Sequence, residues 1–104
     1  MNYSGAKNQR IACVYKLTFP NGKSYVGQTK NLRERLKLYI GAISFKKDKS
    51  AVDLAISEFG LDSISIDILA SPTGLDGDDL LLVLSILEIK YIRDLNTLSP
   101  NGYN

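Results

Sequence analysis

Residues 11–28 read IACVYKLTFPNGKSYVGQ, and this stretch decides the fold. Between Ile11 and Phe19 every second side chain is apolar, an alternation that predicts a β-strand. Residues 20–23 then read Pro-Asn-Gly-Lys, which is a turn signal, and residues 24–28 read as a partner strand. We therefore predict a β-hairpin here.

The type of turn determines whether Tyr15 and Tyr25 share a face of this hairpin. A two-residue turn at Asn21-Gly22 would put the two tyrosines on opposite faces. A three-residue loop, Pro20-Asn21-Gly22, would instead pair Tyr25 with Leu17 and make the tyrosines diagonal neighbours on one face. We favour the second arrangement, because proline suits the first central position of a type I turn and glycine suits the left-handed position that follows.

Beyond the hairpin the sequence predicts three helices and one further strand. The helices are expected at about 31–43, 51–59 and 79–95, and the strand, with apolar residues at alternate positions, at 64–70. Thr29 or Asn31 can cap the first helix, and Ser50 can cap the second, which Gly60 ends.

The composition describes one compact domain. The chain has 104 residues, of which 44% are hydrophobic and 23% charged, enough to build a single core. Residues 1–10 are polar and read as a lead-in, so we expect the domain to span 11–104. Cys13 is the single cysteine, which rules out an internal disulfide. No signal peptide or membrane-spanning apolar stretch is visible, so we expect a cytoplasmic protein without membrane contact.

Charge is divided unevenly along the chain. Residues 1–50 carry eleven Lys and Arg against two acids, a net charge of +9, whereas residues 51–104 carry two against nine, a net charge of −7. A half this basic is typical of a face that binds a polyanion. It is also compatible with two oppositely charged halves that attract each other.

The predicted last helix holds a carboxylate among apolar residues. Residues 80–89 are apolar apart from Ser85 and Glu88, so we expect this helix to be the core helix. On a helical wheel Glu88 lies among Leu84, Tyr91 and Ile92, where a carboxylate is costly unless it is paired, hydrogen-bonded or metal-bound. Two interpretations stay open: a salt bridge to Arg35 or a lysine, and a metal-binding or catalytic role.

Five features, in order, resemble the GIY-YIG nuclease family. Cys13-Val14-Tyr15 matches the first motif with Cys for Gly and Val for Ile, and Tyr25-Val26-Gly27 matches the second with Val for Ile. The segment NLRERL at 31–36, the helix LEIKYI at 87–92 and the closing Asn101-Gly102-Tyr103-Asn104 follow. Each tripeptide alone is weak, but the ordered set is specific and covers roughly residues 11–104.

This resemblance implies a fold and a set of site residues. The family's catalytic domain, as in homing endonucleases, is an α+β fold with a small three-stranded antiparallel sheet flanked by three or more helices. Tyr39 stands one turn after the arginine, where some members carry a histidine; this chain has none. The implied catalytic residues are Tyr15, Tyr25, Arg35, Tyr39, Glu88 and Asn104.

The implied activity is that of a divalent-metal-dependent DNA endonuclease. Mg²⁺ or Mn²⁺ held by Glu88 would contact the phosphate, Arg35 would stabilise the developing charge, and Tyr15 or Tyr25 would take a proton from the attacking water. Asn104 would be an amide near the metal. DNA is expected over the basic first half, on Lys16, Lys23, Lys30, Arg33, Lys37, Lys46, Lys47 and Lys49.

The resemblance also implies partners. Nuclease domains of this family are often joined to a separate DNA-binding domain, so we expect one elsewhere in a longer chain or missing from this one. The domain itself is expected to act as a monomer or a transient dimer on DNA. The alternative function is a non-catalytic DNA-binding or interaction module that retains the fold, and the presence of all five features argues against it.

Overall fold

The computed structural model describes residues 11–45 and 50–104, with side chains described for all of these except 40–45. The predicted lead-in at 1–10 and the candidate DNA contacts Lys46, Lys47 and Lys49 therefore lie outside the described residues. Three strands, three α-helices and a 3₁₀ turn follow one another along the chain. They are β1 Cys13–Thr18, β2 Ser24–Thr29, α1 Leu32–Phe45, α2 Ala51–Phe59, η1 Leu61–Ser63, β3 Ser65–Ala70 and α3 Gly77–Asp94.

The three strands form one antiparallel sheet in the order β2-β1-β3. The α+β fold class expected from the sequence, a three-stranded antiparallel sheet with three flanking helices, is thereby confirmed. Because β1 is central, one edge of β2 pairs with no other strand, and that edge becomes part of the candidate site. None of the described helices is long and apolar enough to cross a membrane.

The hairpin has the predicted register. Leu17 pairs with Tyr25, and Tyr15 pairs with Gly27. Gly22 N donates to Phe19 O at 2.9 Å, which closes a turn over residues 19–22, and Gly22 has a φ of +86°, in the left-handed region that glycine favours. The three-residue loop is therefore confirmed.

The second helix also begins and ends as predicted. Ser50 Oγ accepts from Asp53 N, and the Asp53 side chain accepts from Ser50 N at 3.2 Å, which together make a capping box. Gly60 has a φ of +81°, and its N–H donates to Ile56 O at 2.9 Å at the helix end. In the first helix Asn31 Oδ1 accepts from Glu34 N at 3.3 Å, so Asn31 provides the cap.

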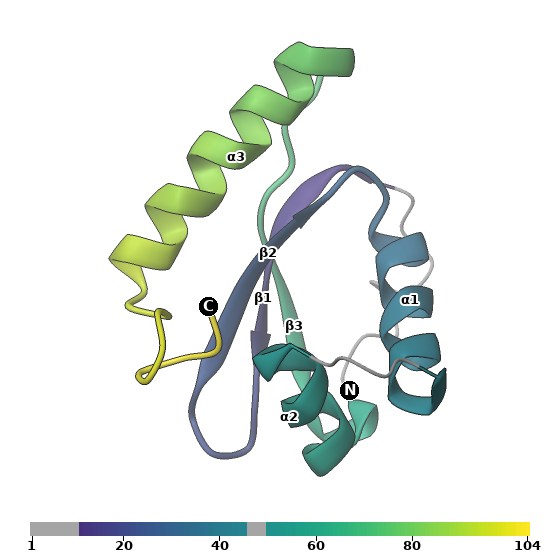
Figure 1. Cartoon of the computed structure of the whole chain (residues 1–104). Coiled ribbons are helices and arrows are strands. Elements are labelled where there is room, and N and C mark those ends of the chain that lie inside the picture. The colour runs from purple at the N-terminus through teal and green to yellow at the C-terminus, as the bar shows by residue number, and fades with distance from the viewer. Residues whose placement is uncertain (1–10, 46–49) are drawn as a thin grey trace.

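Two hydrophobic clusters lie on opposite faces of the sheet, with α1 and α2 on one side and α3 on the other (Figure 1). The larger cluster includes Tyr15, Leu17 and Leu32 and extends to α2. The smaller cluster is centred on Val14, Val26 and Leu84. Because side chains alternate along a strand, successive residues of β1 and β2 supply different clusters.

The expectation that α3 is the core helix is wrong. Among its residues only Leu84 is fully buried, while Leu82 is 60%, Ile86 58% and Ile89 66% exposed. The physical reason is the size of the sheet, because three short strands offer an apolar surface that covers only one side of an 18-residue helix. The other side of α3 faces solvent although its residues are aliphatic.

Candidate active site

Three tyrosines from three elements meet on the α1 side of the sheet. Tyr15 on β1 is fully buried, and its hydroxyl lies 2.5 Å from the hydroxyl of Tyr39 on α1, which is 6% exposed. Tyr25 on β2 is half-buried, and its ring centroid lies 6.5 Å from that of Tyr15. The structure thus brings together the three phenols that the sequence resemblance selected.

Gly27 makes room for this arrangement. A Cβ atom at Gly27 would lie 2.5 Å from the Tyr15 hydroxyl oxygen, 2.6 Å from Tyr15 Cζ and 2.9 Å from Tyr25 Cε2. The Tyr15 ring therefore lies directly across the glycine backbone of the neighbouring strand. Glycine at this place in the second motif is a packing requirement, which alternation of side chains along the strand did not reveal.

We expect Gly27→Ala to lower the free energy of unfolding by about 1–3 kcal/mol and to impair any activity that needs Tyr15. The added methyl group must displace a buried ring that also bonds Tyr39. Denaturant unfolding measures the loss. In a Tyr15→Leu background the same alanine should cost less, and an equal cost in both backgrounds would show that the Tyr15 ring is not the obstacle.

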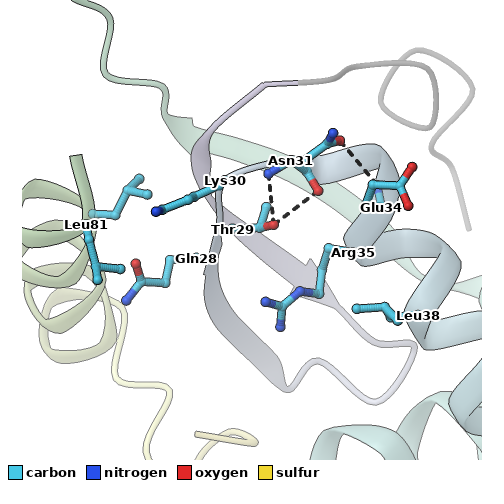
Figure 2. Close-up of a pocket in the computed structure, with 9 residues that line it drawn as sticks. Gln28, Thr29, Lys30, Asn31, Glu34, Arg35, Leu38 and Leu81 are labelled. Carbon is cyan, nitrogen blue, oxygen red and sulfur yellow. Dashed lines mark hydrogen bonds between the residues drawn. The ribbon is translucent and has the colours of Figure 1, made fainter. Parts of the chain in front are cut away.

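Arg35 extends from α1 toward β2, into a cleft of about 430 Å³ between α1 and α3 (Figure 2). Gln28 and Lys30 lie beside it at the end of β2, and Leu38 and Leu81 supply apolar walls from the two helices. Arg35 makes no ion pair with any described residue. Its guanidinium is therefore available to an anion that enters the cleft.

Glu88 approaches from the other side of the sheet. It follows Leu81 and Leu84 on the same face of α3, and it is half-buried. Burial raises the pKa of the Glu88 carboxyl, while hydrogen bonds from Gln28 and the charge of Arg35 lower that pKa in part. Within the described ranges Glu88 forms no ion pair, so a salt bridge from Glu88 to Arg35 or to a described lysine is not present.

Burial and nearby charges also shift the pKa values of the three tyrosine hydroxyls. Burial raises the pKa of Tyr25, the negative charge of Glu88 raises it further, and Arg35 lowers it. Burial likewise raises the pKa values of Tyr15 and Tyr39, and Arg35 lowers both in part. The pKa of Tyr25, on the α1 face of β2, thus responds to the charge of Glu88, which lies on the α3 side of the sheet.

The Asn104 side chain hydrogen-bonds the edge of β2 that pairs with no other strand. Its Oδ1 accepts from Val26 N at 2.8 Å and from Thr97 Oγ1 at 2.7 Å, and its Nδ2 donates to Val26 O at 2.7 Å. The side chain therefore bonds β2 as a neighbouring strand would. Tyr103 N adds a bond to Ser24 O at 2.9 Å.

A match to a family model covers residues 11–104, and the model is described as the GIY-YIG catalytic domain. The chain belongs to the GIY-YIG family. Two solved structures share its fold: a mutant of the catalytic domain of the intron endonuclease I-TevI, and the catalytic domain of the homing endonuclease I-TevI. One, a mutant, is 21% identical with a TM-score of 0.71, covering 90% of this chain and 92% of that chain. The other is 24% identical with a TM-score of 0.66, covering 89% of this chain and 96% of that chain. A search of curated protein sequences finds no match.

The GIY-YIG positions are not all equally placed for chemistry. The charges of Arg35 and Glu88 both act on the pKa of Tyr25, whereas Tyr15 and Tyr39 are buried and bond each other through their hydroxyls. Both bonds that the Asn104 side-chain oxygen accepts, and one donated by its nitrogen, hold β2 and Thr97. The place of this amide near the metal stays a prediction. Asn104 fits a positioning residue for the strand that carries Tyr25.

We expect Asn104→Ala to lower the free energy of unfolding by about 2 kcal/mol, since three hydrogen bonds are lost and the Val26 peptide groups keep no protein partner in their place. The matched control is Asn101→Ala, which removes one exposed bond to Asn96 and should change stability by less than about 0.5 kcal/mol. Chemical unfolding compares them. Equal effects would contradict the strand-holding role.

Among the described residues, the candidate DNA contacts do not all lie around the cleft. Lys30 lines the cleft beside Arg35, whereas Lys23 lies beside the hairpin loop at the other end of β2, with its Nζ 5.8 Å from the Tyr103 ring centroid. Lys16 follows Tyr15 on β1 and so points to the opposite face of the sheet. Lys37 pairs with Glu34 at 3.6 Å on the exposed surface of α1. Of the cations near the tyrosines, Arg35 is the one that lowers their pKa values.

Gln28 is a site residue that the sequence analysis missed. Its Nε2 donates to Ser85 Oγ on α3 at 3.1 Å, and its hydrogen bonding lowers the pKa of Glu88. The signal was available in the alternation along β2, which places Gln28 with Val26 on the apolar α3 face. A polar side chain there requires a polar partner, and Ser85 and Glu88 provide it.

The carboxylate of Glu88 suits Mg²⁺ or Mn²⁺ held through a single protein carboxylate. No cluster of three acidic, cysteine or histidine ligands exists in the described part of the chain. Magnesium in nucleotide chemistry usually keeps several waters and takes one or two carboxylates together with substrate phosphate oxygens. Glu88, which lacks an ion-pair partner among the described residues, meets that requirement.

Proposed function

We propose that this domain is a divalent-metal-dependent endonuclease that hydrolyses phosphodiester bonds in DNA. The observation that carries the proposal is the cleft at the end of β2, where Arg35 of α1 lies across from Leu84 of α3, one helical turn before Glu88. The charges of Arg35 and Glu88 also act on the pKa of Tyr25. A phenol, a guanidinium and a carboxylate suit metal-assisted phosphodiester hydrolysis. Membership of a nuclease family supports the same reaction class.

Arg35 would bind the scissile phosphate. Its guanidinium lines an open cleft, carries no competing ion pair with a described residue, and can donate two parallel hydrogen bonds to phosphate oxygens. Because negative charge grows on these oxygens as water attacks, the same donors bind the transition state more strongly than the ground state. Lys30 on the cleft wall adds positive charge for the DNA strand.

Tyr25 is the tyrosine best placed to accept the proton of the attacking water. Tyr15 is fully buried and its hydroxyl bonds that of Tyr39, whereas Tyr25 is half-buried and interacts with both Arg35 and Glu88. The raised pKa of Tyr25 opposes this role in the free protein, and Arg35 lowers that pKa. A bound divalent ion would supply Lewis-acid assistance to the phosphate and would offset the charge of Glu88.

Glu88 would hold the metal beside the cleft, with Gln28 fixing its carboxylate. Tyr15 and Tyr39 would orient Tyr25 through packing and hydroxyl contacts. No base-reading element is apparent in the described residues, so sequence specificity would come from a separate DNA-binding domain. These roles support a domain that cleaves DNA delivered by another module.

We expect the domain to convert supercoiled plasmid to nicked or linear DNA with Mg²⁺ or Mn²⁺, and not in chelator, leaving 5′ phosphates. Gel electrophoresis measures the conversion, and end-labelling identifies the termini. Because the metal supplies essential activation, chelation should remove cleavage. Plasmid binding without cleavage at any metal concentration would support the alternative, a non-catalytic DNA-binding or interaction module that retains the fold.

A further inference from the structure

The outward side of α3 presents an aliphatic stripe of Leu82, Ile86 and Ile89. These residues are 60%, 58% and 66% exposed. Their spacing of four and three residues aligns them along one side of the helix, opposite Leu84, which is fully buried against the sheet. Figure 1 draws no other helix or strand of the described residues on the side of α3 that lies away from the sheet. Aliphatic residues in this alignment are typical of a helix-pairing seam.

An acidic residue lies beyond one end of the stripe and a basic residue beyond the other end. Asp79 lies on the same side of the helix seven residues before Ile86, and Arg93 lies on it seven residues after Ile86. At 1.5 Å per residue each charge is about 10 Å from Ile86 along the axis. Asp79 makes no ion pair with a described residue, and Arg93 has only its exposed neighbour Asp94, at 3.2 Å.

We propose that α3 pairs antiparallel with α3 of a second copy of this chain, about a twofold axis at Ile86. An axis there sets Ile86 against its own copy and brings Leu82 close to the partner's Ile89. The equal seven-residue spacings then place Asp79 opposite Arg93 of the partner subunit, twice. A parallel pair would instead set Asp79 against Asp79 and Arg93 against Arg93. The charge pattern therefore selects a second copy and one orientation.

This dimer leaves the candidate active site of each copy accessible. Leu81, Leu84 and Glu88 lie on the inward side of α3, toward the cleft and β2. The pairing side carries none of the residues assigned to the reaction. The dimer therefore forms without DNA. The interface is one helix from each copy, which is small, so we expect a dissociation constant on the order of 100 µM.

Sedimentation velocity of the whole chain, over a series from about 10 µM to 1 mM, tests the pairing. Ile86→Lys should weaken self-association about tenfold or more, since a charge replaces the central apolar contact. The matched control is Leu54→Lys on α2, where Leu54 is 57% exposed and lies off the stripe, and self-association should be unchanged. A chain that stays monomeric throughout the series, or equal effects of both lysines, would overturn the proposal.

Charge exchange tests the orientation and the identity of the partner. Asp79→Arg alone and Arg93→Asp alone should each weaken dimerisation, because each sets like charges opposite one another. The double variant should restore it to within about twofold of the unaltered chain, because the pairs reform with reversed sign. Thermal melts of the monomeric fraction confirm that each variant is folded. Failure of the double variant to recover would refute the antiparallel register.

Discussion

Replacing Arg35 with alanine is expected to lower the rate of plasmid cleavage about a thousandfold. Arg35 is the cation of the cleft that also lowers the pKa values of the tyrosines, so its loss removes charge stabilisation and support for the phenolate together. Because Arg35 makes no ion pair with a described residue, the fold should be little affected. Initial rates of supercoiled-plasmid loss in Mg²⁺ measure the effect.

Arg33→Ala is the matched control for this change. Arg33 lies on the same helix two residues earlier and does not line the cleft, because residues two apart on a helix point to different sides. We expect at most a severalfold loss from Arg33→Ala, through weaker DNA binding. Losses that are equal in the two variants and that disappear at saturating DNA would show that both residues only bind DNA and that Arg35 is not the catalytic arginine.

Glu88→Gln is expected to abolish cleavage while leaving metal-free stability unchanged or slightly raised. Glutamine keeps the shape and removes the charge that would hold the metal. The raised pKa of Glu88 sets the sign of the stability effect. A carboxyl whose pKa is higher in the folded state than in the unfolded state stabilises the fold below the unfolded pKa, and this stabilisation is lost as pH rises through the folded pKa.

At neutral pH the ionised Glu88 therefore opposes folding, and glutamine relieves the cost. Melts of both proteins in chelator at neutral and acid pH measure this, with the advantage of glutamine shrinking as the pH falls and Glu88 becomes protonated. A structural salt bridge would predict the reverse, a loss of about 3–5 kcal/mol. A large fall in melting temperature with cleavage retained would make Glu88 a structural residue and leave the nuclease without its metal ligand.

The sequence alone determined the hairpin and therefore the shared face of the tyrosines. Local chemistry sufficed there, because proline fixes one backbone angle of the loop and glycine at Gly22 accepts a positive φ. The start of α2 at Ser50 and its end at Gly60 were likewise set by residues close to them in the sequence. Arg35 and Tyr39 were selected through the resemblance to the family, and their spacing of four residues on one helix makes them neighbours.

Only the tertiary structure decided the roles of α3 and Asn104. An apolar helix can be buried on all sides or on one, and the width of the sheet, which no local pattern encodes, left Leu82, Ile86 and Ile89 in solvent. Asn104 lies 78 residues from Val26 in the sequence, so only the folded structure shows that its amide bonds the edge of β2. The effect of the Glu88 charge on the pKa of Tyr25 depends in the same way on the strand order, because β2 lies at an edge of the sheet, where no further strand separates its two faces.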